Sequence, residues 1–521
     1  MAIDPHHLPE EAAALRQMVL QLLQLVEDKD RLLERVQHQL QQLLRQRYGP
    51  TRERIDENQL FLYAAQIVAA SQAAAAAPTT TDSAAEETPA AGATTKANRS
   101  GHGRKPLPAS LERKRVVFDL EESQRQCPHC QTAMRKIGED CSERLEFVPA
   151  CLHVIEEVRP KYACAKGCGG VVAAGKPAMP IEKGLPGPGL LAQVAVSKYG
   201  DHLPLNRMET IFQRHGVELS RQTMCDWMGA CAELVSPLWE RMKQVVLTSK
   251  VVQTDDTPVP VLDRELTRTR TGRIWTYIGD QRHPYIVYDY TGNRSREGPD
   301  EFLKDYNGYL QADAYPGYDA IYKDPKRAIL EVCCWAHARR KFYEAQTSDL
   351  CRTTVVLAYI GLLYEVEREA RDGKRNAVER FALRQTKSRP ILDDLKTYLE
   401  AERLTVLPRS PVGEAIDYTI SNWKALERYC EDGDLEIDNN GAERSLRPIV
   451  VGRNNWLFYG SDQGGRTGAV LSTLIATCKR VRVEPFTYLR DLFTRIGSHP
   501  HSRLDELLPD RWQAAPSVTQ S

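Results

Sequence analysis

Two adjacent carboxylates interrupt a run of strand-forming residues in VVQTDDTPVPVL, at residues 251–262. Thr and Pro follow Asp255 and Asp256, so a turn that ends the strand would account for this composition. A carboxylate fixed at the end of a rigid strand is also a good ligand for a hard divalent cation. The stretch alone leaves both interpretations open.

Two further acids occur in comparable positions. Asp313 ends a predicted strand, and Glu443 lies in a predicted helix for which Asp438 is the expected N-cap. Arg444 and Arg447 follow Glu443 within one turn. A Glu beside arginines is usually part of an ion-paired surface. The alternative is a third ligand for Mg²⁺ (or Mn²⁺) next to arginines that bind phosphate.

Two close cysteine pairs form a second set of metal-ligating residues. Cys127 and Cys130 lie in CPHC, and Cys164 and Cys168 lie in CAKGC. Four thiolates at such spacing are typical of a structural, ribbon-like Zn²⁺ site, although the second pair is C-x3-C rather than C-x2-C. Residues that could substitute for a ligand are His129, Cys141 and Cys151.

The segments before these sites predict self-association and a flexible connection. Apolar residues repeat every seven positions across 11–47, which indicates a coiled coil, or else an amphipathic helix packed on its own domain. Residues 48–68 are predicted to form a basic, helical extension. The Ala-, Thr-, Pro- and Ser-rich stretch 69–106 predicts a flexible linker. Its basic end would contact phosphates or act as a solubilising tail.

Residues 187–247 have the outline of a helix-turn-helix. A helix ends near Gly216, and a second begins after Ser220, a plausible N-cap. Met224 and Trp227 would face the core. The exposed start of the second helix, at Arg221 and Gln222, would reach base edges or phosphates, although many helical pairs bind nothing.

From residue 250 the chain alternates strands and helices in the order of an RNase H-like core: three strands, a helix, a strand, a helix and a strand. Asp255 would end the first strand, and Asp313 would end the fourth, which lies beside the first in that fold. The two carboxylates would then face each other at one edge of the sheet. The strongly helical stretch 349–432 predicts an all-α insertion within this core.

Composition limits the remaining possibilities. The 521 residues exceed what one core accommodates, and 70 basic residues balance 70 acidic ones. No apolar run approaches the roughly 18 residues of a membrane span, and the N-terminus does not have the pattern of a secretory signal. The 13 cysteines are an odd number, which favours reduced thiols in a cytoplasm. We therefore expect a cytoplasmic multidomain α+β protein without a membrane partner.

The chain resembles the IS66-family transposases of bacterial insertion sequences over nearly its whole length. The motifs that carry this resemblance are TDDTPV (254–259), LQADAYPGY (310–318), CWAHARRKF (334–342) and DNNGAERSLRPIVVGRNNWLF (438–458), with KYGDHLPLNR (198–207) and the cysteine pairs. The resemblance implies a DDE triad of Asp255, Asp313 and Glu443. Asp256 occupies a position that is often acidic in the family, so it is the alternative first acid.

The resemblance also implies double-stranded DNA as the partner: the terminal inverted repeats of the element and a target. Two-metal phosphodiester cleavage and strand transfer would require a homo-oligomer, and accessory proteins of the same element are possible partners. Two rival functions are a DNA-binding regulator without catalysis and a stand-alone nuclease of the same fold. The role of the C-x2-H spacing at Cys334 and His337 stays open, and the predicted phosphate contacts beside it are Arg339, Arg340 and Lys341.

The predicted segments follow from these patterns. They are the coiled coil 11–47, the extension 48–68, the linker 69–106, a zinc-binding domain 107–180, the helix-turn-helix-like domain 187–247, the RNase H-like core 248–348 and 433–497, the helical insertion 349–432 and a C-terminal tail 498–521.

Overall fold

The computed structural model describes residues 186–263, 265 and 268–514, together with short stretches at 19–20, 152, 161–163, 171–173 and 179–181. The chain divides into two units, 78–160 and the remainder, and all elements below belong to the second of these. Three predicted segments lie almost entirely outside the described residues: the coiled coil, the extension and the linker. The four predicted zinc-ligating cysteines also lie outside them. Strands β1 (Lys161–Ala163) and β2 (Val171–Ala173) pair antiparallel on either side of the second cysteine pair in the sequence.

A five-stranded mixed sheet has the order β5-β4-β3-β6-β7. The first three strands along the chain form an antiparallel meander, and β6 and β7 continue the sheet in parallel with β3. The fourth strand of the sheet therefore lies beside the first, as predicted. The strands are β3 (Val251–Val261), β4 (Arg270–Ile278), β5 (Ile286–Thr291), β6 (Gly308–Ala312) and β7 (Ile329–Cys333).

The prediction that the first strand ends at Asp255 is wrong. Strand β3 continues to Val261 and pairs with β4 along this whole length, whereas its pairing with β6 stops at Gln253. Beyond that point β3 has a partner on one side only. A proline such as Pro258 is tolerated there, because a one-sided strand does not need every backbone N–H. Asp255 therefore lies just past the end of the parallel pairing.

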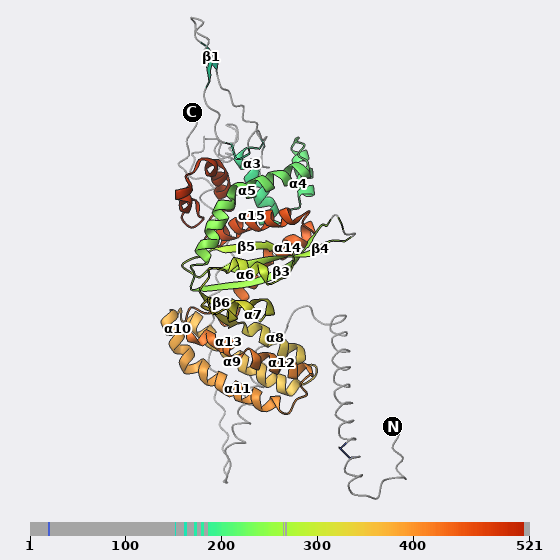
Figure 1. Cartoon of the computed structure of the whole chain (residues 1–521), viewed down its shortest axis with the longest axis vertical. Helices are drawn as coiled ribbons and strands as arrows, with labels where there is room; N and C mark the ends of the chain where they lie inside the picture. Colours follow the sequence, from blue (N-terminus) through green and yellow to red (C-terminus); the bar gives the residue numbers. More distant parts are fainter. Residues whose placement is uncertain are drawn as a thin grey trace, which may run out of the picture. The chain divides into compact units, whose positions relative to one another are not determined.

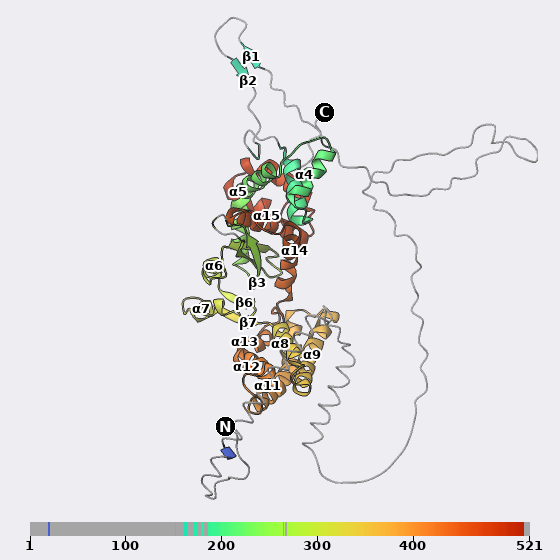
Figure 2. The ribbon, with the colours of Figure 1, turned by 90° about the vertical axis from the view of Figure 1, so that its right-hand side faces the viewer.

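Helices cover both faces of the sheet (Figures 1 and 2). On one face, α14 (Asn440–Trp456) contacts β3 and β4, and α15 (Asp462–Arg480) lies along β5. On the other face, the ring of Phe302 at the end of α6 (Glu297–Phe302) stacks on Tyr277 with centroids 3.6 Å apart. The short helix α7 (Asp319–Lys323) packs against β7.

The helices before the sheet follow the predicted pattern. They are α3 (Pro188–Ala195), which continues as a π-helical turn to Gly200, α4 (Leu205–Arg214) and α5 (Arg221–Val246). Ser220 caps α5 by accepting the backbone N–H of Thr223 at 3.1 Å. Met224 and Trp227 are buried, and Arg221 is exposed, as expected. Helix α5 also packs against α15, so these helices and the sheet share one hydrophobic core.

A helical insertion separates β7 from α14 and has a hydrophobic core of its own. Among the described residues, no helix has both the length and the apolar character needed to cross a membrane. The insertion and the helix that leads into it consist of α8 (Trp335–Ala345), α9 (Leu350–Asp372), α10 (Ala377–Leu383), a π-helical turn (Arg384–Ser388), α11 (Arg389–Arg403), α12 (Pro411–Ser421), α13 (Trp423–Glu427) and a 3₁₀ turn (Arg428–Glu431). After α15, the described chain ends with α16 (Pro485–Arg495) and two 3₁₀ turns.

Candidate active site

Asp255 and Asp256 lie on opposite faces of β3, because side chains alternate along a strand. Asp255 pairs across the ladder with Thr276, whose hydroxyl is 2.9 Å from that of Ser445 on α14. Asp255 therefore lies on the face that α14 covers. Asp256 is on the face of Trp275, its partner across the ladder.

The two carboxylates have different partners. Asp256 is 3% exposed and accepts hydrogen bonds from Arg273 at 2.8 Å and from Arg294 at 2.8 Å. Asp255 forms no ion pair among the described residues, and its Oδ1 accepts only the backbone N–H of Asp256 at 2.8 Å. Asp256 is thus neutralised by two guanidinium groups, whereas the charge of Asp255 is uncompensated.

Asp255 feels the charges of the two other acids expected to act with it. Burial raises the pKa of Asp255 to about 7, and the charges of Asp313, Asp256 and Glu443 add to the increase. Burial also raises the pKa of Asp313, although the charges of His337 and Arg294 oppose this. Carboxylates that are buried and mutually repulsive suit a hard divalent cation, which would offset their charge.

Two of these acids, Asp313 and Glu443, lie at the ends of secondary-structure elements. Asp313 directly follows β6, and Glu443 lies in the first turn of α14. The Nε2 atom of His337, in the first turn of α8, is 3.8 Å from Oε1 of Glu443. Within the described part of the chain, however, no three His, Cys, Asp or Glu side chains stand close enough together to hold a metal ion. The acids form an electrostatic group without forming a complete coordination shell.

The predicted N-cap of the Glu443 helix is displaced by one residue. Helix α14 begins at Asn440, and its N-cap is Asn439 rather than Asp438. Asp438 instead accepts the backbone N–H of Asn440 at 3.1 Å and the hydroxyl of Tyr364 at 3.2 Å. Asn439 occupies the N-cap position without a side-chain cap hydrogen bond, and its amide donates instead to the sheet, a contact that the sequence did not show.

The segment that leads into α14 is fixed against β6, the first residue of α8 and β3. The side chain of Gln311 in β6 donates to the carbonyl of Glu436 at 2.6 Å, and the backbone N–H of Trp335 donates to the carbonyl of Ile437 at 3.1 Å. The amide of Asn439 donates to the carbonyl of Thr254 in β3 at 2.8 Å. These contacts locate the helix of Glu443 relative to both strands that carry the other acids.

Cys334 and His337 have separate surroundings. Cys334 is buried, and its sulfur accepts the backbone N–H of Asn439 at 3.1 Å. The Nε2 atom of His337 is the ring nitrogen near Glu443, and the Nδ1 atom is buried without a hydrogen-bond partner. The Oδ1 atom of Asn439 is likewise buried and unpaired. Both unpaired atoms belong to residues beside the acids: His337 is near Glu443, and Asn439 is bonded to the residue before Asp255.

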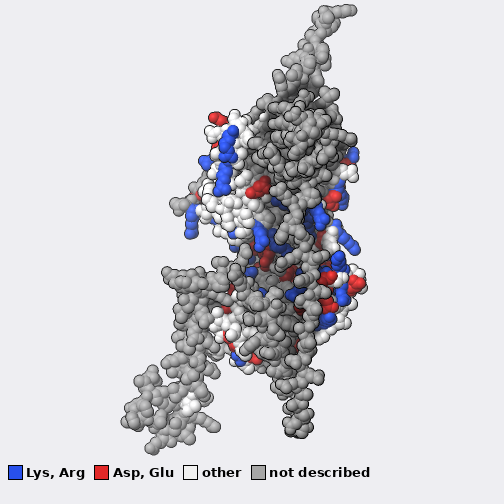
Figure 3. Space-filling model, turned by 180° about the vertical axis from the view of Figure 1, so that it is seen from behind, with Lys and Arg blue, Asp and Glu red and all other residues white. Residues whose placement is uncertain are grey.

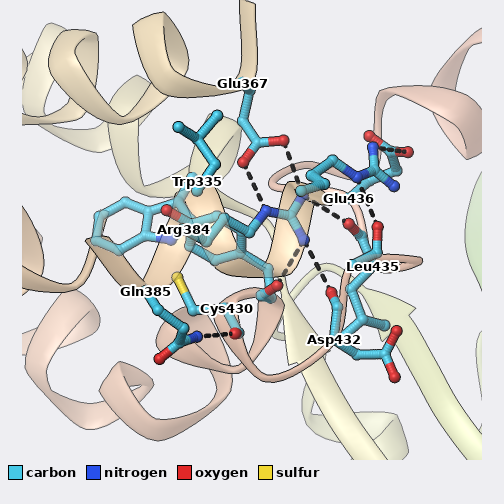
Figure 4. A network of polar contacts seen from close by, with 12 residues as sticks. Trp335, Glu367, Arg384, Gln385, Cys430, Asp432, Leu435 and Glu436 are labelled. Atoms are coloured by element: carbon cyan, nitrogen blue, oxygen red, sulfur yellow. Dashed lines mark hydrogen bonds and ion pairs between the residues drawn. The ribbon is translucent and has the colours of Figure 1, made fainter. Parts of the chain in front are cut away.

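A buried arginine in the insertion holds the other end of the same segment (Figure 4). Arg384 is completely buried and forms two hydrogen bonds of 2.7 Å with the carboxylate of Glu367. It also donates to the carbonyls of Tyr429, Asp432 and Leu435 at 2.7–2.8 Å. The insertion therefore fixes the chain shortly before it enters the site.

The predicted basic contacts are placed at the surface. Arg444 and Arg447 are exposed on α14, and within the described chain neither forms an ion pair with an acidic side chain. The ion-paired surface considered for this helix is therefore absent there. On α8, Arg340 and Lys341 are exposed, with Lys341 4.6 Å from the ring centroid of Tyr418. Arg339 on the same helix is half-buried.

The zero net charge is unevenly distributed over the surface. On the face seen from behind, Lys and Arg side chains stand out on a largely uncharged area at the upper left (Figure 3). Lower on the right, basic and acidic side chains are interleaved. Such local separation is compatible with an anionic partner despite the balanced total.

The fold and the site define a class of protein. It is a mixed α/β protein whose acids gather beside the central strands of the sheet. Within it, the chain belongs to the Transposase IS66 family, which matches residues 183–467. Further matches are the IS66 C-terminal element over 473–509, the zinc-finger binding domain of transposase IS66 over 124–169, and Transposase C of IS166 homeodomain over 35–116. The zinc-finger match contains all four predicted cysteine ligands.

Similar proteins occur in Sinorhizobium fredii (strain NBRC 101917 / NGR234). The uncharacterized protein y4hP is 36% identical over 438 residues, which cover 80% of this chain and 78% of that protein. The uncharacterized protein y4qI is 37% identical over 439 residues, which cover 82% of this chain and 80% of that protein. Both relatives therefore resemble most of the present chain.

Proposed function

We propose that the protein is a DNA transposase of an insertion sequence. It would bind the terminal inverted repeats of the element and catalyse metal-dependent cleavage and strand transfer into target DNA. The observation that carries the proposal is the placement of Asp255 on β3, Asp313 just after β6 and Glu443 on α14, near enough for the last two charges to raise the pKa of Asp255, in an IS66-family protein.

The catalytic core is proposed to be RNase H-like. An antiparallel meander extended by two parallel strands, with the fourth strand beside the first, supports this assignment. In such a core, acids on neighbouring strands meet at one edge. Asp255, just past the parallel pairing, and Asp313, just after β6, have this arrangement.

Asp255, Asp313 and Glu443 are the proposed ligands for Mg²⁺ (or Mn²⁺). The chemistry supplied by the bound ions is activation of the attacking oxygen and stabilisation of the leaving oxygen. Asp256 is not proposed as a ligand, since Arg273 and Arg294 already neutralise it.

Other residues would position the DNA and the acids. Arg444 and Arg447 are exposed beside Glu443 and would bind phosphates, because a guanidinium offers two parallel donors to phosphate oxygens. Arg221, Arg340 and Lys341 would add contacts farther along the DNA. His337 would orient Glu443 through its ring nitrogen.

The N-terminal part of the chain is proposed to assemble and extend the enzyme. Cys127, Cys130, Cys164 and Cys168 would hold a structural Zn²⁺. The heptad helix 11–47 would join at least two subunits, because both ends of an element must be brought together. The proposed location is the bacterial cytoplasm, with accessory proteins of the element as further partners.

The rival functions predict different behaviour. A regulator without catalysis would bind the repeats and leave them intact, and a stand-alone nuclease would cut DNA without joining it. The test uses full-length protein and DNA that carries the inverted repeats flanking its gene. Mg²⁺-dependent cutting at the repeat boundary and joining to a second DNA are expected. Binding without any cutting would contradict the proposal.

A further inference from the structure

One exposed stripe runs along α14, beginning one residue after Glu443. At helical spacing such residues share a face, and none of those in this stripe is acidic. The stripe starts with two arginines that have no acidic partner among the described residues and ends in two asparagines. Its members are Arg444, Arg447, Val451, Asn454 and Asn455.

The stripe continues onto two exposed apolar residues that follow the helix. Leu457 is 63% exposed and Phe458 is 44% exposed. Leu457 has φ +70° and ψ −50°, and the N–H of Phe458 donates to the carbonyl of Trp456 at 2.9 Å. These values describe the rare, strained form of the three-residue γ-turn. A branched apolar residue is costly in this conformation, so the surrounding structure must impose it.

Two aromatic side chains on either side impose the turn. The rings of Trp456 and Tyr459 lie 4.5 Å apart and pack on the core beside α14. Tyr459 is also bonded to the end of β3, donating to the carbonyl of Pro260 at 2.9 Å and accepting the N–H of Leu262 at 2.8 Å. Because both flanking residues are anchored, Leu457 and Phe458 are held outward.

Close packing leaves the anchors little freedom. A Cβ at Gly468 would lie 2.6 Å from the hydroxyl of Tyr459, and one at Gly452 would lie 2.7 Å from the indole nitrogen of Trp456. Both rings therefore sit directly on glycine backbone. Leu262, itself exposed, adds a third apolar side chain beside the turn. The projection of Leu457 and Phe458 is thus a fixed feature of the fold.

We propose that this surface docks the duplex at the end of the element, with Leu457 and Phe458 inserted against bases. The inference rests on the proposed transposase function and deepens it. Arg444 and Arg447 would hold the backbone beside the acids, since unpaired cations favour phosphate. Exposed Leu and Phe side chains at the far end of a surface that carries such cations suit wedges that unstack base pairs.

The helix sets the reach of this contact. Arg444 and Trp456, the last residue of α14, are separated by 12 helical rises, roughly 18 Å at about 1.5 Å per residue, and Leu457 follows directly. Duplex DNA rises about 3.4 Å per base pair, so the disturbed base lies within about six base pairs of the cleaved phosphate. Asn454 and Asn455, between the two ends, have side-chain amides suited to base edges in that interval.

The test places 2-aminopurine, whose fluorescence rises when it unstacks, at each of the base pairs nearest the cleavage point. Wild-type protein should raise the fluorescence at one or two of these positions. The pair Leu457→Ser with Phe458→Ser should abolish the rise and weaken binding about tenfold. A matched control is Leu404→Ser, since Leu404 is 89% exposed but lies in the insertion. It should behave as wild type.

A second variant separates contact from folding. Leu457→Gly relieves the positive φ, so it should unfold at the same or a higher temperature while reducing the fluorescence rise. If wild type binds and cuts the DNA and the double variant gives the same fluorescence and binding, the inference is overturned and the proposed function stands. The inference is also overturned if the double variant changes only sedimentation without DNA, because the surface then joins two copies. Wild-type protein that fails to bind the repeats would overturn the proposed function itself.

Discussion

The side-chain amide of Asn439 donates a 2.8 Å hydrogen bond to the backbone carbonyl of Thr254, the residue before Asp255. Asn439 is completely buried and is also the N-cap residue of α14, which carries Glu443. Its backbone N–H is bonded to the sulfur of Cys334. One residue thus connects the strand of the first acid to the helix of the third.

Replacing Asn439 should therefore impair catalysis more than stability alone explains. Asn439→Ala removes the donor to Thr254 and leaves that buried carbonyl short of a partner, at a cost of about 1–3 kcal/mol. We expect cleavage to fall at least tenfold while the repeats are still bound. Asn376→Ala is the matched control, because Asn376 is likewise an Asn at an N-cap position, but it lies in the insertion, where its side chain accepts the backbone N–H of Glu379. Its loss should cost about 1 kcal/mol and leave cleavage unchanged. Equal cleavage by the two variants would remove the positioning role.

The two adjacent acids of β3 should respond in opposite ways to the same substitution. Asp255→Asn removes a proposed metal ligand, so it should abolish cleavage. It also removes repulsion within the acidic group, so it should not lower the unfolding temperature. Asp256→Asn breaks charge-assisted hydrogen bonds with Arg273 and Arg294, so it should cost about 2 kcal/mol. Some cleavage should remain in folded protein. Thermal unfolding and strand-cleavage assays on both variants decide the matter, and the reverse pattern would exchange the two roles.

The buried pair in the insertion should be sensitive to loss of one partner. Arg384→Met leaves the carboxylate of Glu367 buried and unpaired, which should cost about 3–5 kcal/mol. Arg384→Met with Glu367→Met should cost less than the single change. The control is Arg403→Met, which breaks an exposed pair with Asp417 and should cost less than about 1 kcal/mol. Denaturant unfolding measures the free energy of unfolding of all three variants. A double variant less stable than Arg384→Met would contradict this account.

The cysteine pairs predict a removable structural metal. Cys127→Ser or Cys164→Ser should release about one zinc per chain, because thiolates supply the ligands of such sites. Residues 186–514 have a hydrophobic core without this segment, so their unfolding should change little. Elemental analysis of protein purified without chelators provides the measurement. A full complement of zinc in both variants would exclude these ligands.

The strands and helices along the chain were predicted from local patterns, and the fourth strand was placed beside the first because their succession is that of an RNase H-like core. Apolar runs locate the strands, although Asp255 does not mark the end of β3, and Ser220 and Gly216 mark where helices begin and end. Family resemblance then selected Asp255 over Asp256. Alternation along β3 supports the same choice, since only one of the two faces α14.

The contacts that fix the site could not be predicted from local patterns. The partners of Asp256 lie on β4 and in the loop before α6, so no short-range spacing reveals them. Asn439 was overlooked because its side chain bonds to the carbonyl of Thr254, which is 185 residues away in the sequence. The strained turn at Leu457 depends on anchors provided by β3 and α15, and a Leu gives no signal of positive φ.

The central claim is that Asp255, Asp313 and Glu443 hold divalent cations in one site. Iron(II) with ascorbate tests this directly, because radicals formed at a bound iron cut the nearby backbone. The account predicts cuts close to all three residues, suppressed by excess Mg²⁺ and absent from Asp255→Asn, while Asp256→Asn protein that remains folded keeps them. Cuts confined to other parts of the chain, or cuts that Asp255→Asn leaves unchanged, would contradict it.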